Sequence, residues 1–363
     1  MIPWAPFGLT AVTAALLIVP ISPALLELRR RNDAAPLPTS RHDGKITNFA
    51  DSFSSHLEPL RSQLEQCRAS REIRRIQNKS GDVLLVGLPD FDFDAAVLRE
   101  ISAVMCVFPA YVPAGRVIET DICADGGLRI GEAATVRAAL SAEDVVLGPN
   151  SSVFRWLYAK GNIFMQAGSA AYGRLSSGTA IVLDRGCGFQ RMHATRIIVA
   201  IEATADSCAY LAAIPQTPQQ QNASQTHSDE GDSLSSSRPR MRVDGDFVLP
   251  AGETMHANII ATGEVRIGRG ASLFGNAKSY KDTIVEESGS LFGAIVCGGN
   301  ICLGLGSFAR GPLMAEGHIT MNRGSCVGKS DALTTVSASH ITITDGCNLH
   351  GTVWARVLGR VEG

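Results

Sequence analysis

The sequence predicts an all-β fold, a triangular β-helix (solenoid) of about 18 residues per rung that is built in two tandem blocks. Three observations predict it: apolar residues recur every 17 or 18 positions, they alternate with other residues inside each short stretch, and glycines return at regular intervals. We expect an N-terminal transmembrane helix and a helical juxtamembrane segment to precede the two blocks.

The repeat is clearest as paired ladders of apolar residues in each half of the chain. In the second half the ladders are Val265, Thr283, Ile301 and Ile319, and then Ile267, Val285, Leu303 and Met321. In the first half they are Leu128, Val145, Ile163, Ile181 and Val199, and then Ile130, Leu147, Met165, Leu183 and Ile201. A fixed period of this length indicates repeats that stack on their neighbours to bury a shared core.

Alternation inside each stretch predicts strands rather than helices. Pairs such as Ile259 and Ala261 put both side chains on one face of a strand. Three short strands per turn make a triangular coil whose equivalent residues stack roughly 4.8 Å apart. We predict a small inward column at Ala261, Ser279, Cys297 and Ala315, and corners at Gly270, Gly306, Gly324 and Gly346.

The two blocks look like copies of each other at an offset of 137 residues. The segment Val112–Gly115 (VPAG) matches Leu249–Gly252 (LPAG), and Leu128 matches Val265. A tandem duplication is the simplest explanation. The predicted divisions are a transmembrane anchor (1–28), a juxtamembrane linker, basic helix and capping segment (29–110), the first solenoid block (111–213), a disordered linker (214–241) and the second solenoid block (242–363).

The N-terminal segment has the character of a membrane span, because residues 2–26 carry no charged side chain. A helix of that length would reach about 37 Å, enough for the ~30 Å hydrocarbon core of a bilayer. Arg29, Arg30 and Arg31 follow it directly, and no Lys or Arg precedes it. The positive-inside rule therefore predicts a single-pass inner (cytoplasmic) membrane protein with its bulk in the cytoplasm. A cleaved secretory signal peptide is the alternative.

A helical pattern follows from Phe49 to about Gln77, with Leu57 and Leu64 on one face and arginines over the rest. Two interpretations stay open: a basic helix on an anionic inner leaflet, and a helix that caps the open end of the solenoid. Further along, Asp82–Leu88 is expected to form a buried strand and residues 95–104 a helix.

The composition argues against several classes of function. A net charge of −2 gives no indication of nucleic-acid binding. Nine cysteines, an odd number with no CxxC pair, favour a reducing compartment over a disulfide framework. The chain contains neither GxGxxG nor GxxxxGK[ST], so no nucleotide site is predicted.

Histidine is the residue type that could support catalysis here. Five histidines lie in or near the rungs, namely His193, His256, His318, His340 and His350. A hexapeptide-repeat acyltransferase would use one as general base, but the aliphatic residue that such a repeat needs every six positions is present at only half of the sites. Cys297 is expected to point inward and Cys302 outward, so they do not converge on a metal. We therefore predict no catalytic residue, no cofactor and no metal site.

The second block resembles the bactofilins, the polymer-forming cytoskeletal proteins. The resemblance rests on residues 245–250 (GDFVLP), on residues 263–268 (GEVRIG) and on the rung pattern that follows, and it covers about 110 residues. It implies a right-handed coil in a protein that polymerises without nucleotide, associates with membranes and supports envelope or polysaccharide machinery. Two solenoid blocks and a transmembrane-like N-terminus depart from the usual pattern.

The expected function is accordingly a membrane-anchored, non-enzymatic scaffold that self-associates and organises an envelope or exopolysaccharide apparatus. Its expected partners are itself, as a homo-oligomer or filament, the membrane, and envelope or polysaccharide-synthesis proteins, with no nucleic acid. The candidate assembly surface combines the C-terminal end with an apolar corner stripe: Val353, Trp354, Phe274, Phe292 and Tyr172. The alternatives are a carbohydrate-active or acyltransferase enzyme on a solenoid fold, and a secreted adhesin-like solenoid.

Overall fold

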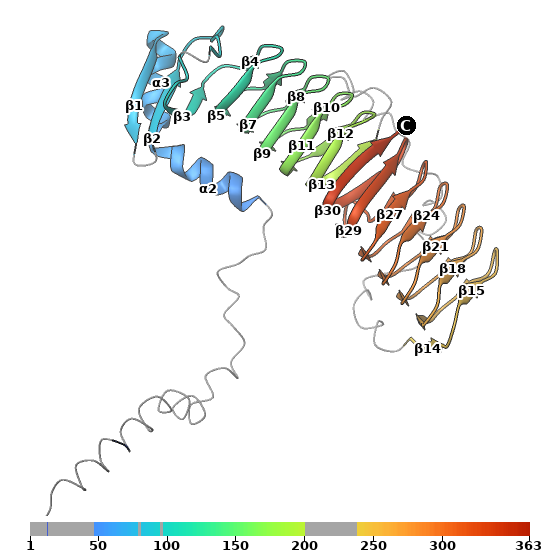
Figure 1. The fold of residues 1–363 in the computed structure, drawn as a ribbon. Coiled ribbons are helices and arrows are strands. Elements are labelled where there is room, and N and C mark those ends of the chain that lie inside the picture. Colours follow the sequence, from blue (N-terminus) through green and yellow to red (C-terminus); the bar gives the residue numbers. More distant parts are fainter. Residues whose placement is uncertain (1–12, 14–46, 79–80, 95–96, 200–237) are drawn as a thin grey trace, which may run out of the picture. The chain divides into compact units, whose positions relative to one another are not determined.

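The computed structural model describes residues 13, 47–78, 81–94, 97–199 and 238–363 (Figure 1). The fold is a β-solenoid of about 13 turns with about 18 residues per turn, which confirms the predicted all-β coil. Residues 49–363 form one compact unit, and the following description concerns this unit. Apart from Thr13, the predicted transmembrane segment 1–28 lies outside the described residues. Within the described residues, no helix is long and apolar enough to cross a bilayer.

The N-terminal part of the unit is a cap made of helices and a hairpin. Its elements are α2 (Asn48–Leu57), the 3₁₀ helix η3 (Glu58–Leu60), α3 (Arg61–Ser70), β1 (Ile73–Asn78), β2 (Gly81–Val86) and β3 (Ile101–Cys106). Strand β2 stacks in parallel on β3, and β1 pairs antiparallel with the other edge of β2. The hairpin therefore covers a strand edge that would otherwise be exposed at this end of the coil.

The helices of the cap lie against the outer face of the first strands, with their apolar side inward. Leu57 and Leu64 are 2% and 1% exposed, and they share a cluster with Leu85 of β2 and Met105 of β3. In the same cluster the ring of Phe53 meets Trp156 edge-on, at a centroid distance of 4.9 Å. The helix therefore packs on the outer face of the solenoid, while the β1–β2 hairpin lies at its end.

Two predictions about the cap need correction. The helix ends at Ser70 rather than near Gln77, because Arg71 adopts the left-handed conformation (φ 51°) and the chain then continues as strand β1. The helix predicted at residues 95–104 is wrong, since β3 occupies Ile101–Cys106. Strands on both sides, β2 and β5, supply the backbone hydrogen bonds of β3, and this pairing overrides its local helical pattern.

The first solenoid block continues from β3 with alternating short and long strands. They are β4 (Ala110–Val112), β5 (Val117–Ala124), β6 (Leu128–Ile130), β7 (Thr135–Ser141), β8 (Val145–Leu147), β9 (Ser152–Ala159), β10 (Ile163–Met165), β11 (Ala170–Ser177), β12 (Ala180–Leu183) and β13 (Gly188–Val199). The stacking begins at β2, before the predicted boundary at residue 111. The predicted ladders are confirmed as far as Ile181 and Leu183.

The last step of the first block differs from the predicted ladders. Ile181 pairs with Ile197 rather than Val199, and Leu183 pairs with Val199 rather than Ile201. The final rung is thus two residues shorter than predicted, and Ile201 lies outside the described residues. A shortened rung keeps the apolar side chains inward, because a shift by two residues preserves the alternation of a strand.

The second block has three separate short strands in most turns. They are β14 (Arg240–Val243), β15 (Phe247–Leu249), β16 (Thr254–Met255), β17 (Asn258–Ala261), β18 (Val265–Ile267), β19 (Ser272–Leu273), β20 (Ala277–Ser279), β21 (Thr283–Val285), β22 (Ser290–Leu291), β23 (Ile295–Cys297), β24 (Ile301–Leu303), β25 (Phe308–Ala309), β26 (Leu313–Ala315), β27 (His318–Met321), β28 (Cys326–Val327), β29 (Thr334–Thr344) and β30 (Asn348–Glu362). Its ladders from Val265 to Ile319 and from Ile267 to Met321 are confirmed.

We name the three sides of the coil by the strands of the second block. Side A holds β15, β18, β21, β24 and β27; side B holds β16, β19, β22, β25 and β28; side C holds β14, β17, β20, β23 and β26. In the first block the short strands correspond to side A, and the long strands β5, β7, β9 and β11 cover sides B and C. This naming makes equivalent surfaces of the two blocks comparable.

One corner of the coil has the same backbone geometry in both blocks. Residues with positive φ recur there, at Gly115, Ala133, Asn150, Gly168 and Gly186 in the first block and at Gly252, Gly270, Ser288, Gly306, Gly324 and Gly346 in the second. The predicted corner glycines are therefore confirmed. The predicted small column is confirmed too, because Ala261, Ser279, Cys297 and Ala315 are all buried.

The two blocks meet at their last strands. Strand β13 pairs antiparallel with β30, so the green end of the first block lies beside the red end of the second (Figure 1). The other edge of β30 pairs with β29. The second block therefore begins at β14, far from the first block along the stack, and coils back toward it.

Candidate functional site: ends and outer faces of the solenoid

The first candidate surface is the inner junction, which we define as the contact of β13 with β30. Residues 191–194 of β13 lie opposite residues 351–354 of β30. The flanking pairs are 188–189 with 359–360, and 197–198 with 348–349. The antiparallel register thus runs along the whole last turn of each block.

The inner junction has the pattern of a two-fold symmetric interface. Residues 188–189 and 348–349 both lie on side B, because they stack on β11 and β28. Residues 197–198 and 359–360 both lie on side A, because they stack on β12 and β29. Side B of each block therefore faces side A of the other, and the two C sides face each other. Reciprocal pairing of this kind is what a two-fold axis between equal surfaces produces.

Packing at the inner junction is as tight as in the core. Phe189 and Met192 of β13 and Val353 of β30 are at most 1% exposed. The Phe189 ring lies over Gly359, where an added Cβ would come within 2.0 Å of the ring. A glycine is required at that position for the ring to be accommodated, so the two strands are matched in shape.

Polar contacts between the two strands add to this packing. The Nδ1 atom of His193 lies 3.0 Å from Oγ1 of Thr352, and the Nδ1 atom of His350 lies 2.9 Å from the carbonyl oxygen of Thr195. Burial lowers the pKa of both histidines, with a further lowering of the His193 pKa by Arg191. Each ring is thus favoured in its neutral form at the junction.

Two residues of the predicted assembly surface lie at this junction. Val353 is buried opposite Met192, and Trp354 is 45% exposed with the guanidinium of Arg191 at 5.4 Å from its ring centre. The C-terminal end, which is part of the predicted assembly surface, is not a free end, because β13 of the first block pairs with β30. The physical reason is that an unpaired strand edge and an apolar cross-section gain most by pairing with a matching end.

The three other predicted residues lie in exposed or half-buried ring stacks. Phe274 and Phe292 stack with centroids 4.4 Å apart and planes at 2°, and His256 stacks on Phe274 at 4.6 Å. Tyr172 belongs to a separate stack on the first block, 5.5 Å from Phe154, and is 49% exposed. The structure therefore brings Phe274 and Phe292 together and leaves Tyr172 apart. Ring columns of this kind are suited to docking an apolar partner.

The open rung is the second candidate surface, and we define it as strands β14, β15 and β16. Each of them pairs with a single partner among the described strands, namely β17, β18 and β19. Met241 belongs to the inward column of Ile259, yet it is 40% exposed whereas Ile259 is 1% exposed. Val243 and Met255 are half-buried and pack on the core. This end of the core is therefore only partly covered by the described residues.

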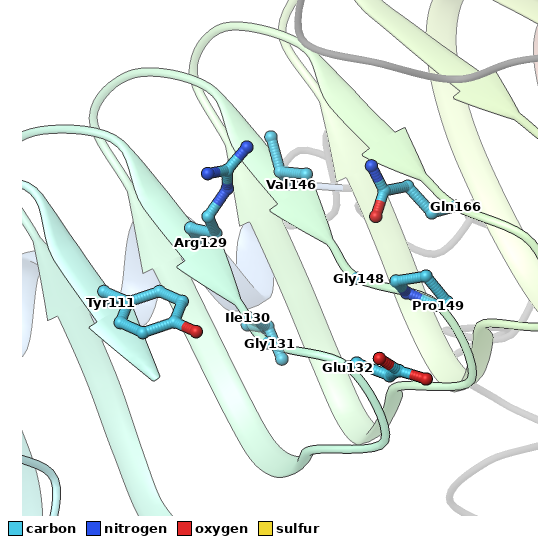
Figure 2. Close-up of a pocket in the computed structure, with 9 residues that line it drawn as sticks. All are labelled: Tyr111, Arg129, Ile130, Gly131, Glu132, Val146, Gly148, Pro149 and Gln166. Carbon is cyan, nitrogen blue, oxygen red and sulfur yellow. The ribbon is translucent and has the colours of Figure 1, made fainter. Parts of the chain in front are cut away.

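A shallow groove of about 490 Å³ runs over side A of the first block (Figure 2). Tyr111, Arg129 and Val146 stand on neighbouring strands β4, β6 and β8, with Glu132 and Gln166 beside them. The Tyr111 ring is 52% exposed. A groove lined by an exposed ring, a cation, a carboxylate and an amide has the chemistry to bind a polar ligand such as a sugar.

The remaining candidate residues are the histidines and cysteines of the outer faces and of the small column. His318 and His340 stack at 4.6 Å on neighbouring turns. Cys297 is buried, as predicted, and Cys302 is within 3.7 Å of the Asn322 side-chain amide. In the described part of the chain no three His, Cys, Asp or Glu residues lie together in a way that could hold a metal ion.

Known proteins offer no further guide to this site. No family model matches the chain, and neither a curated protein nor a solved structure shows significant similarity to it.

The sequence pattern indicates Val353 and Trp354 of the inner junction, but not the other residues that define the junction and the open rung. Phe189, Gly359 and Met241 carry no distinctive motif. The 137-residue offset was the available signal, because a duplicated chain has two equivalent pairs of ends that can meet.

Proposed function

We propose that this chain is a non-enzymatic, membrane-anchored β-solenoid scaffold, right-handed as in bactofilins, that self-associates and organises envelope or exopolysaccharide machinery. The observation that carries the proposal is the open rung: β14, β15 and β16 are unpaired on one edge among the described strands, and the core residue Met241 is 40% exposed there. Unpaired strand edges over an apolar core are templates for pairing with another chain.

The outer faces support the role of a platform. A stacked coil holds equivalent side chains at regular intervals, so a column such as His256, Phe274 and Phe292 presents flat rings along the coil axis. Rings already ordered by stacking lose little conformational entropy when a partner binds. Anchoring by residues 2–26, which carry no charge, would hold this platform at the inner membrane with its bulk in the cytoplasm.

The proposal is tested with the full chain purified in detergent without nucleotide. We expect particles larger than one chain by sedimentation, and recovery of the protein with the membrane fraction of cells. A chain that stays monomeric at high concentration would refute the proposed self-association. Recovery in the soluble fraction would refute the proposed membrane anchor.

The groove on side A supports a second candidate function, direct binding of a glycan. Tyr111 offers a stacking face, and Arg129, Glu132 and Gln166 offer hydrogen-bonding groups along the same groove. Titration with oligosaccharides should then show binding that Tyr111→Ala weakens at least about tenfold, as expected for the loss of one stacking ring. Tyr280→Ala is the matched control, because Tyr280 is 60% exposed on the second block. Equal binding by both variants would exclude the groove.

A further inference from the structure

The N-terminal ends of the two blocks correspond at the 137-residue offset, yet they differ in how far their apolar core is covered by neighbouring residues. At the N-terminal end of the first block, β1 pairs with the free edge of β2, and the inward residue Val86 is 0% exposed. At the N-terminal end of the second block, the open rung has no described strand on its edge and Met241 is 40% exposed. Strand β1 is itself an edge strand with β2 as its one described partner, so the two ends differ in the exposure of the core. Among the described residues in the turns of the coil, from β2 to β30, an inward core residue is this exposed at the open rung only.

We propose that the chain assembles as a closed dimer, in which the open rungs of two copies pair antiparallel about a two-fold axis. The inference rests on the proposed self-association and specifies its extent. A single open surface that pairs with itself is used up when two copies have met, so growth stops at two. A filament would need a second end with an exposed core, and in the first block Val86 and Val112 are 0% exposed. The outer edge of β1 carries Arg74 and Arg75, and charged side chains disfavour strand addition at such an edge.

The inner junction supplies the argument for a second copy as the occupant. There the chain pairs two equivalent last turns antiparallel, with side B against side A and side C against side C. The same arrangement at the open rung would place β14 of one copy against β14 of the other. It would also place β15 of each copy against β16 of the other copy. Met241, the inward residue of β14, would then be buried as Met192 is buried at the inner junction, where it is 0% exposed.

The strand β14 also alternates apolar and charged residues in a pattern that suits this contact. Met241 and Val243 face inward, in register with Ile259 and Ala261, while Arg240 and Arg242 alternate with them and are exposed. The inward pair provides apolar surface at the contact, and the exposed arginines stay in solvent on the outer face. Partner recognition at this edge would therefore come from backbone hydrogen bonds and apolar contact, as in strand addition.

The test uses the full chain in detergent with two matched variants. Met241→Lys puts a charge on the inward side of the open rung. Met314→Lys puts the same charge at a residue of similar exposure, 45% against 40%, on the outer face of β26 in the middle of the stack. Sedimentation should give the mass of two copies for the parent and for Met314→Lys. For Met241→Lys the dissociation constant of the dimer should be at least about tenfold higher than for the parent.

The outcomes separate this inference from the proposed function. Filaments or masses that keep growing with concentration would overturn the closed dimer and leave self-association in place. A monomer at every concentration would overturn both. A dimer that Met241→Lys does not weaken, with circular dichroism and melting unchanged, would place the contact elsewhere, for example between N-terminal segments, and would overturn the inference as well. If Met241→Lys melts earlier than Met314→Lys, Met241→Gln replaces it, with the same expected dissociation.

Discussion

The inner junction and the open rung are both ends of the same kind of coil, and they differ in how their last core residues are covered. Met192 at the inner junction is 0% exposed, whereas Met241 at the open rung is 40% exposed. Strand β13 has partners on both edges, and β14 has one described partner. The difference shows that end pairing, rather than rung composition, decides whether a turn of this coil is core or surface.

The largest expected effect comes from breaking the inner junction at Gly359. The substitution Gly359→Val would place Cβ about 2.0 Å from the Phe189 ring. The ring would have to leave its site, and we expect a loss of about 3 kcal/mol in the free energy of unfolding, measured by chemical denaturation. Gly188→Ala is the control, because its Cβ would meet only Ala170 at 3.6 Å. Equal stability of the two variants would show that the junction does not contribute to stability.

The cap can be tested at Leu64, which is 1% exposed against the outer face of the first strands. Leu64→Asp removes a buried apolar side chain and buries a carboxylate without a partner. We expect a destabilisation of about 3 kcal/mol and faster hydrogen exchange in β1 and β2. Gln66→Asp on the exposed side of α3 should change stability by less than about 0.5 kcal/mol. Unchanged exchange in β2 for Leu64→Asp would mean that packing of the helix on the outer face does not stabilise this end.

The pH dependence of stability sharpens the comparison of the two ends, because both perturbed histidines lie at the inner junction. Burial lowers the pKa of His193 and of His350 in the folded chain. The unfolded chain therefore binds more protons below the ordinary histidine pKa of about 6.5, and stability falls as the pH falls through and below that value. Denaturation midpoints should drop between pH 7.5 and pH 5.

The matched variant for the pH experiment is the double substitution His193→Gln and His350→Gln, which removes both titrating rings. Its stability should change less between the same two pH values than that of the parent. An identical drop in the parent and the double variant would assign the pH dependence to other groups.

The smallest expected effect concerns the shared corner, where Ala133 and Ser288 adopt positive φ (52° and 57°) at positions that glycine occupies in neighbouring turns. Ala133→Gly and Ser288→Gly should each stabilise the fold by about 0.5–1 kcal/mol, because glycine avoids the steric cost of this conformation. Ala134→Gly, one residue along and fully buried, should instead destabilise it. Thermal melting of the three variants measures the difference.

Much of the fold could be predicted from the sequence because the interactions within a solenoid are close to local. Each turn contacts the next at a distance of about 18 residues, so the ladder from Val265 to Ile319 and the corner at Gly270 are visible in the pattern of residue types. The errors fell where a strand took its character from its neighbours. The local pattern predicts a helix over residues 95–104, whereas pairing with β2 and β5 makes Ile101–Cys106 a strand.

The candidate site was less predictable than the fold. The stack of Phe274 on Phe292 follows from the repeat, since equal positions in neighbouring turns meet. The position of Val353 does not follow from the repeat. The sequence of an apolar last turn is the same whether that turn is exposed, paired with another molecule or paired with the same chain. The partner of Val353 is Met192, which lies in the other block.

The sequence by itself determined the length of the rung, the inward columns and the corners, because these depend on contacts between adjacent turns and on the conformations that each residue type allows. Only the tertiary structure decided which ends meet, that β13 and β30 pair antiparallel, and that β14 rather than the C-terminal strand has a single partner among the described strands. The physical reason is that pairing of ends joins segments far apart in the chain, and a repeat that specifies each neighbour equally well carries no information on where the stack stops.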